Sequence, residues 1–468
     1  MHLPFAALVT IPTWLQAAPV ATSPVATPTT TNTESLAPLP ANSPPAQSGA
    51  DTHVLHLADA VSLALSNQPA LRQARAQTVA ASGRTVQVRS AFFPQLTGVA
   101  SYQLLYNTSS TYARGGATGT GGTTPTPTGT SSTIGYFSLG GTASQLIWDF
   151  GQTYNRYRAA NEAESSYEAS EKTSELTVVA NVRRAYFSAR AQKDLVDVAR
   201  DALENQQRHL IQIQGFVAAG TRTEIDLAQT LTDVANARVT LINAQNAYDV
   251  ARAQLIQAIG GGAATNFDVA NDEIPPVDGE ELPTEQLVAR ALEARPEILA
   301  LERQRQSLHL TTKSLSDNYW PSLSASASGA YAGTSLDSLN PAWSIGATLS
   351  WPFFQGGLTK GQVREAEANE DAARASIDTE KLQVRFDVEQ AQLSLRAAKI
   401  VKDAAEETLR NARAQLRLAE GRYTAGVGTI IELGDAQITF TNAGAQVVQA
   451  KFQLSSARVN LLVALGRQ

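Results

Sequence analysis

The side chains that most often carry catalysis or bind metals are sparse in this sequence. Of its 468 residues five are His and none is Cys. The closest His pair, His53 and His56, lies beside a Pro-rich linker, and no H-x-x-x-H helix occurs. The Gly-rich run 115–122 opens no helix and lacks the Gly-Lys-Ser/Thr of a phosphate loop. We therefore predict no enzyme activity, no catalytic residue, no cofactor and no metal site.

Two carboxylates near the C-terminus are placed for a different kind of chemistry. Glu432 and Asp435 are three residues apart, so on a helix they share one face. If several copies surrounded one axis, these carboxylates would create a concentrated negative field that can bind cations. The alternative is that they only stabilise a helix N-terminus. The elements that would place them therefore have to be found.

The composition excludes several classes of protein. The net charge of −6 gives no sign of nucleic-acid binding. Without cysteine there can be no disulfide, no thiolate metal site and no acyl-cysteine lipid anchor. Residues 1–54 are predicted to be a signal-like remnant followed by a disordered Pro/Thr/Ala linker. Beyond that linker, no apolar run is long enough for a transmembrane helix.

An internal duplication organises the rest of the chain. Pro69 and Pro94 match prolines that lie 227 residues later, at Pro296 and Pro321. Three glycines match at an offset of 206 instead, pairing Gly151, Gly220 and Gly260 with Gly357, Gly426 and Gly466. The difference of 21 residues places an insertion within 107–132 of the first half. We predict repeats at 55–260 and 286–468, joined by a segment at 261–285.

Each repeat is predicted to contain a β-hairpin. The strands are expected at about 95–106 and 133–145 in the first repeat, and about 322–332 and 342–352 in the second. In each, apolar residues alternate with Ser, Thr or Gly, as on a strand with one apolar and one hydroxyl-lined face. Their length suits tilted membrane-spanning strands.

Long helices are predicted for most of the remaining sequence. Residues 152–214 contain neither Pro nor Gly and would span about 95 Å as a helix. Residues 358–420 are their counterpart in the second repeat. Each long helix is expected to end in a Gly-containing turn and to return through a second helix, at about 224–259 and 430–465. Shorter helices, at about 70–92 and 297–319, lead into the hairpins.

Four strands cannot form a membrane barrel alone, because the smallest such barrels have about eight. Unpaired strand edges in lipid cost several kcal/mol for each unsatisfied group. We therefore expect three copies to share one twelve-stranded barrel. Its Ser/Thr face would line the lumen, and its apolar face would contact the lipid of the outer membrane. Four tryptophans are candidate membrane-interface residues, although packing between strand and helix is an alternative for them: Trp148, Trp320, Trp343 and Trp351.

Several motifs in this order resemble the TolC-like family of outer-membrane efflux and secretion channels. They include FFPQL (92–96) and YWPSL (319–323), LSWPFFQGG (349–357), and the turns AAGTRTEIDLAQ (218–229) and EGRYTAGVGTIIELGDAQ (420–437). The resemblance implies a mainly α protein with β structure: a homotrimer with a shared transmembrane β-barrel in the bacterial outer membrane and an antiparallel α-helical tunnel in the periplasm. It further implies docking to a periplasmic adaptor (membrane fusion) protein and to an inner-membrane transporter.

The resemblance also implies roles for individual residues. Glu432 and Asp435 match the acidic positions that narrow the periplasmic entrance of such channels, and Asp226 is the weaker counterpart in the first repeat. Six residues of the two turns are expected to dock the adaptor: Gly220, Thr221, Arg222, Gly426, Val427 and Gly428. The resulting function is a passive exit duct of a tripartite efflux pump or type I secretion system. The alternative is a soluble or surface-attached helical scaffold without channel activity.

Overall fold

The computed structural model describes residues 53–110, 129–261 and 267–467. Both repeats form the same series of elements. The first contains α1 (Leu57–Asn67), α2 (Pro69–Arg89), η1 (Ser90–Phe92), β2 (Gln95–Ser110), β3 (Gly129–Trp148), α3 (Gln152–Ala218) and α4 (Glu224–Ile259). The second contains α5 (Thr284–Ala294), α6 (Pro296–Ser316), η2 (Asp317–Tyr319), β5 (Ser322–Gly333), β6 (Asn340–Ser350), α7 (Leu358–Thr424) and α8 (Ile430–Ala464). The equivalent helices and the first strands of the two hairpins start 227 or 206 residues apart, which are the two offsets found in the sequence, whereas β3 and β6 start 211 residues apart.

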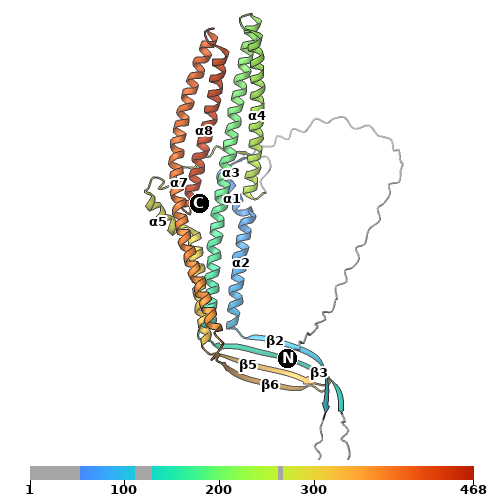
Figure 1. Ribbon diagram of the computed structural model, residues 1–468. Coiled ribbons are helices and arrows are strands. Elements are labelled where there is room, and N and C mark those ends of the chain that lie inside the picture. Colours follow the sequence, from blue (N-terminus) through green and yellow to red (C-terminus); the bar gives the residue numbers. More distant parts are fainter. Residues whose placement is uncertain (1–52, 111–128, 262–266, 468) are drawn as a thin grey trace, which may run out of the picture. The chain divides into compact units, whose positions relative to one another are not determined.

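The strands form one antiparallel sheet in the order β2-β3-β5-β6 (Figure 1). Its register places apolar residues opposite one another on one face, such as Leu323 opposite Leu349. Hydroxyls meet on the other face, where the Ser328 and Ser344 side chains are hydrogen-bonded at 2.9 Å. The alternation read from the sequence therefore describes the two faces of this sheet.

The strand limits differ from the expected ones in the first hairpin. The strands β2 and β3 pair up to Ser110 and Gly129, so the insertion expected as a loop over 107–132 begins and ends within paired strands. The Gly-rich run 115–122 lies outside the described residues. The β6 strand ends at Ser350, two residues before the expected limit.

Glycines direct the chain from the sheet into the long helices. Gly151 precedes α3 with φ of 101°, and Gly357 precedes α7 with φ of 89°. Both angles lie in the left-handed region, which glycine reaches without the steric cost of a Cβ atom. These two glycines therefore match in the sequence because both repeats need the same backbone conformation at this point.

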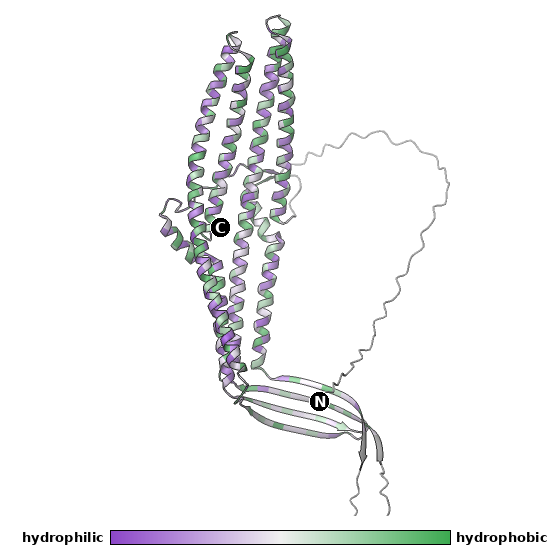
Figure 2. Cartoon of the chain, in the orientation of Figure 1, coloured by the Kyte–Doolittle hydropathy of each residue, from purple (hydrophilic) through white to green (hydrophobic). Residues whose placement is uncertain are grey.

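The helices pack as a layer in which α3 is central. In the half of α3 nearer the sheet, it packs between α2 and α6. In the half farther from the sheet, it packs between α4 and α8. On the second repeat's side, α7 packs against α6 and α8 (Figure 1). Figure 2 shows hydrophobic and hydrophilic residues interspersed along these helices, as expected where each helix buries one face. The outermost helices of the layer are therefore α2 and α4 on one side and α7 on the other.

Serine side chains fasten the two repeats to each other along α3 and α6. Ser314 donates to the carbonyl of Gln152 at 2.9 Å, and Ser307 donates to that of Ala159 at 2.7 Å. One heptad further on, Ser166 of α3 donates to the carbonyl of Ala300 at 2.8 Å. The seven-residue spacing keeps these contacts on one seam of the helix pair.

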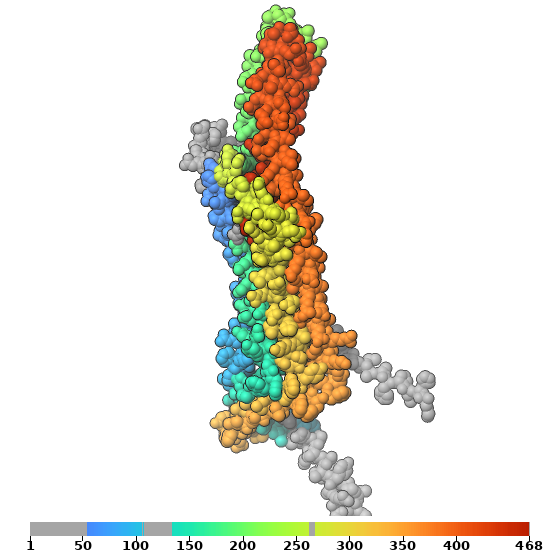
Figure 3. Space-filling model, turned by 90° about the vertical axis from the view of Figure 1, so that its left-hand side faces the viewer, coloured from blue at the N-terminus to red at the C-terminus, as the bar shows by residue number. Residues whose placement is uncertain are grey.

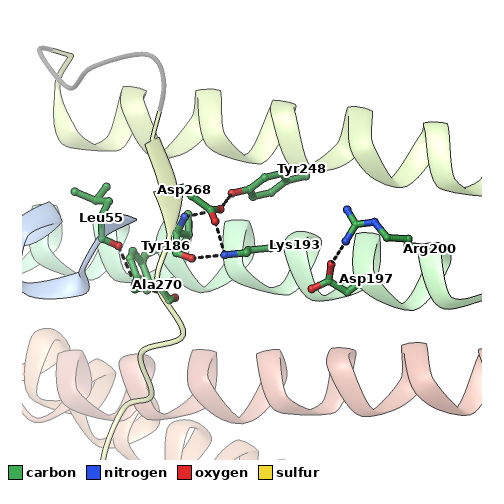
Figure 4. Close-up of polar contacts among 9 residues, drawn as sticks. Leu55, Tyr186, Lys193, Asp197, Arg200, Tyr248, Asp268 and Ala270 are labelled. Carbon is green, nitrogen blue, oxygen red and sulfur yellow. Dashed lines mark hydrogen bonds and ion pairs between the residues drawn. The ribbon is translucent and has the colours of Figure 1, made fainter. Parts of the chain in front are cut away.

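The segment between the repeats is held by a polar network (Figure 4). Its strand β4 (Phe267–Val269) pairs in parallel with β1 (His53–Leu55). Asp268 accepts hydrogen bonds from Lys193 and Tyr248, each at 2.7 Å. Although burial alone would raise the pKa of the Asp268 carboxyl, these bonds hold it below its usual value. The segment expected at 261–285 is thus tied to both long helices of the first repeat.

The expectation for residues 1–54 needs one correction. His53 and Val54, assigned to the disordered linker, lie in strand β1, because the β4 backbone offers them a hydrogen-bonding edge. The rest of the predicted remnant and linker lies outside the described residues. The helix α5, which follows the segment between the repeats, packs on α7. Figure 3 shows this part of the chain (yellow) beside α7 (orange).

Candidate functional site at the helix tips

The two turns that join the long helices share one backbone design. Gly220 and Gly426 adopt φ of 72° and 77° at equivalent positions after α3 and α7. The next helices begin at equivalent N-caps, where the hydroxyls of Thr223 and Thr429 accept from the amides of Asp226 and Glu432. Asp226 also accepts from the Thr223 amide, which completes a capping box in the first repeat. The structure therefore gives Asp226 a capping role in its own helix.

A buried tyrosine joins the two tips. Tyr423 of α7 is 2% exposed and lies in a cluster with Ile213, Leu433 and Ala436. The Arg222 guanidinium lies 4.5 Å from its ring centre, and the His209 ring lies edge-on at 5.4 Å. Arg222, expected to be free for docking, thus contacts the second repeat through a cation–π interaction. Tyr423 and His209 were not predicted to be functional residues. The only feature of the sequence that could have indicated them is that they fall on the buried face of their helices.

The two acidic residues expected to act together have different surroundings within α8. Glu432 forms an ion pair with Arg422 at 2.9 Å. Asp435 instead lines a cavity of about 360 Å³ together with Asp233 of α4. Burial raises the pKa of the Asp233 carboxyl above its usual value, while His209 acts in the opposite direction. Within one copy, Asp435 and Asp233 therefore form the acidic surface, and Asp233 is a residue that sequence reasoning missed.

Four of the six expected docking residues are exposed at the ends of the turns, whereas Arg222 is half-buried and Gly428 is buried. Val427 is 68% exposed, and a side chain on Gly220 or Gly426 would meet no other atom within 4 Å. Thr221 uses its hydroxyl to donate to the Phe216 carbonyl at 2.9 Å. Gly428 is different, because a Cβ there would lie 2.9 Å from the Tyr423 amide nitrogen. Its small size is required by the turn itself.

Two cavities lie along α8 between α3 and α7. The one at the tip has a volume of about 410 Å³ and is lined by His209, Leu416 and Tyr423 among others. The other, nearer the segment between the repeats, is lined by Phe187, Lys402 and Arg458 among others. On α7, Lys402 and Leu416 are two heptads apart, so both cavities lie on one side of the helical layer. Asp435 lines a different cavity, over α3, between α4 and α8.

The four tryptophans lie at two levels of the sheet. Trp148, Trp320 and Trp351 are exposed where the strands meet the helices. Trp343 lies eight residues from Trp351, about 26 Å along an extended strand, and is 80% exposed. Between them Ile345 and Leu349 are exposed on the same face. This arrangement resembles an apolar band bounded by aromatic residues.

Neither a membrane-spanning helix nor a metal site is found in the described ranges 53–110, 129–261 and 267–467. None of the helices there carries an apolar stretch with the length and composition needed to cross a membrane. Likewise, no group of three or more His, Asp or Glu side chains in this part of the chain is placed to hold a metal ion.

Solved structures of outer-membrane channels are similar to this fold. The CmeC outer membrane channel of Campylobacter jejuni superimposes with a TM-score of 0.74, at 19% identity, over 88% of this chain and 85% of that one. The open state of the MtrE outer membrane channel of Neisseria gonorrhoeae gives a TM-score of 0.70, at 19% identity, over 88% and 89%. The chain thus shares the fold of these channels, which combines long helices with β-barrel strands.

Sequence comparison then gives the family. The profile of the outer membrane efflux protein family matches residues 60–261 and 287–467. The outer membrane protein TolC of Escherichia coli is 27% identical over 421 residues, which are 86% of this chain and 80% of that protein. The solvent efflux pump outer membrane protein SrpC of Pseudomonas putida is 25% identical over 347 residues, 73% of each chain. The chain belongs to the outer membrane efflux protein family and is an exit duct of the outer membrane. The predicted resemblance is confirmed.

Proposed function

We propose that three copies of this chain close into one duct, with twelve strands in the outer membrane and a helical tunnel in the periplasm. The observation that carries the proposal is the sheet order. Within the described residues, β2 and β6 each have one edge without a partner strand. One edge belongs to the first repeat and the other to the second. Pairing β6 of one copy with β2 of the next is a head-to-tail contact, which closes into a ring.

Exposed apolar stripes on the outer helices support the same arrangement. On α7, Leu382, Phe386, Leu393 and Ile400 are each more than half exposed and follow heptad spacing. On the opposite side of the layer, Val79 and Val86 of α2 and Val239 and Ile242 of α4 are exposed to a similar degree. A stripe of this kind is typical of a helix that packs against another helix. In a ring, α7 of one copy would cover α2 and α4 of its neighbour.

Transport through the duct would depend on two further partners. We place a periplasmic adaptor at the tip turns, around Gly220–Arg222 and Gly426–Gly428, and an energised inner-membrane transporter behind it. The support is the family membership and the exposure of both turns. Three copies of Asp435, with Asp233 beside each, would line the periplasmic entrance and favour cations. In this proposal the duct itself is passive, and the inner-membrane transporter supplies the energy.

The test combines mass and conductance. Light scattering of the detergent-solubilised protein should give the mass of three chains. In planar bilayers it should form small, cation-selective openings, and Asp435→Asn should reduce the selectivity. The matched control is Asp201→Asn, because Asp201 is exposed on α3, away from the cavity that Asp435 lines. A monomer that stays soluble without detergent would overturn the proposal. Unchanged selectivity in a conducting trimer would move the entrance to other residues.

A further inference from the structure

Exposed aromatic residues gather where the helices meet the sheet. We call this region the junction belt and define it as residues 89–94, 149–158, 313–320 and 351–364. Phe150 and Trp320 stack at 5.5 Å between ring centres, and the Trp351 indole donates to the Tyr319 carbonyl at 3.1 Å. Phe353 and Phe354 are 81% and 90% exposed. Rings so exposed on a short segment are typical of a surface that another phase or molecule covers.

The same belt is rich in positive charge. It contains six basic residues and two acidic ones, in a chain whose net charge is −6. The basic residues lie near the sheet ends of all four joining helices: Arg89, Arg156, Arg158, Lys313, Lys360 and Arg364. All six are exposed. The excess of positive charge is therefore local to this level of the molecule.

The two acidic residues of the belt are already engaged. Asp149 accepts from the Thr153 amide at 2.7 Å, where it caps the start of α3. Asp317 accepts from the side-chain amide of Asn155 at 2.8 Å. Neither forms an ion pair with a basic residue of the belt, and no other described carboxylate does so. The six cations thus remain available to an external anion.

Two arginines lie close to exposed aromatic rings of the belt. The Arg89 guanidinium is 6.0 Å from the Phe93 ring centre, and that of Arg158 is 6.0 Å from the Tyr154 ring centre. Phe93 and Tyr154 are each 55% exposed. A cation beside an aromatic ring matches the interface of a bilayer, where rings lie at the headgroup level and basic side chains reach the phosphates.

We propose that the junction belt binds the phosphate headgroups of anionic phospholipids in the leaflet that faces the periplasm. The inference rests on the proposed function, which places the sheet in the outer membrane. The charge of the belt selects an anionic ligand, and the exposed rings select one that carries an apolar tail. An anionic phospholipid has both properties. Such lipids would hold the base of the barrel at a fixed depth.

The experiment uses the intrinsic tryptophans Trp148, Trp320 and Trp351 as reporters. The full protein is placed in phosphatidylcholine nanodiscs that contain a minor fraction of either brominated phosphatidylglycerol or brominated phosphatidylcholine. Bromine quenches nearby tryptophan fluorescence, so the ratio of quenching gives the relative association of the two lipids. We expect phosphatidylglycerol to be favoured by roughly threefold, since basic residues near a membrane surface each attract anionic lipid.

The variant Arg89→Gln/Arg158→Gln/Lys360→Gln/Arg364→Gln should bring this ratio close to one. The control Lys172→Gln/Arg290→Gln/Lys381→Gln/Arg417→Gln removes the same charge from exposed positions about 30 Å or more of helix away from the sheet, and should keep the wild-type ratio. The variant Arg89→Lys/Arg158→Lys/Arg364→Lys, which leaves Lys360 in place and preserves the charge at all four positions, should keep it too, and this guards against a folding defect. Equal ratios in wild type and belt variant would overturn the inference. Conductance in phosphatidylcholine bilayers tests the duct separately, and its loss would overturn the proposed function instead.

Discussion

The tips of the two repeats have nearly the same backbone and different chemistry. Both turns contain a left-handed glycine, at Gly220 and Gly426, and both following helices start at a threonine N-cap. The second repeat supplies the buried ring of Tyr423, where the first has Val217. The first repeat supplies Arg222, which lies over that ring, where the second has Gly428. Duplication has thus produced two halves of one contact rather than two copies of it.

This comparison shows how a repeated fold can acquire a specific closing contact. Equivalent positions are free to diverge, provided that the left-handed glycine and the helix cap remain. The predictions below exchange or remove residues at equivalent positions of the two tips. Local stability is best followed by hydrogen exchange of the amides in each turn, because a tip can open without unfolding of the whole chain.

The largest effect is expected at the buried ring. Tyr423→Ala should destabilise the tip by about 3 kcal/mol, since it removes a fully buried aromatic side chain. The equivalent change Val217→Ala should cost about 1 kcal/mol, because Val217 is smaller and only partly buried. Hydrogen exchange of residues 421–433 would measure both. Equal effects would mean that the two tips contribute equally to their contact.

A second pair of substitutions compares Gly428 with Arg222. Gly428→Ala should destabilise the second turn by about 1–2 kcal/mol, because the added Cβ lies 2.9 Å from a backbone nitrogen. Arg222→Ala leaves its turn intact and removes one half-buried cation–π contact, which should cost about 0.5–1 kcal/mol. The same hydrogen-exchange measurement applies. A Gly428→Ala variant with unchanged exchange would show that the second turn can relax.

Much of the fold could be predicted from this sequence because its signals are periodic and occur twice. The glycine pair Gly151 and Gly357 and the proline pairs fixed the repeat, and the alternation around Leu323 fixed the faces of β5. The extent of β2 and β3 could not be predicted, since the residues at 107–110 and 129–132 are Asn, Gly, Ser and Thr and carry no apolar alternation. Backbone pairing between neighbouring strands extends them beyond that pattern.

The candidate site was harder to predict, because its contacts cross between repeats. Glu432 and Asp435 share a helix face by spacing, yet Arg422 engages one and a cavity receives the other. Asp233 and His209 come from different helices, and no local pattern marks them. Their importance follows from the packing of α3, α4 and α7, which only the tertiary structure provides.

His209 makes the first-repeat side of the tip sensitive to pH. Burial lowers the pKa of His209 from its ordinary value of 6.5, although a hydrogen bond with Gln212 and the charge of Asp233 oppose this. The folded tip therefore prefers the neutral ring. Its contribution to stability is complete above about pH 6.5 and is lost as the pH falls toward the lowered value, because the open state takes up the proton first.

The equivalent residue in the second repeat is Gln415, which is exposed and does not titrate. His209→Gln should therefore remove the acid-dependent loss of protection in the tip amides while keeping a polar side chain there. Tip exchange rates measured from pH 8 to pH 5 would test this. An undiminished pH dependence in the variant would assign it to Asp233, the half-buried carboxyl that interacts with His209.

The smallest expected effect concerns the ion pair between Arg422 and Glu432. Both side chains are substantially exposed, so Arg422→Gln should cost only about 0.5 kcal/mol of tip stability. It should nevertheless increase cation selectivity in planar bilayers, because it leaves the Glu432 carboxylate uncompensated near the proposed entrance. The equivalent first-repeat change, Phe216→Gln, frees no carboxylate and should leave selectivity unchanged. Equal selectivity in both variants would place Glu432 away from the ion path and leave Asp435 as the acidic residue of the second repeat that acts there.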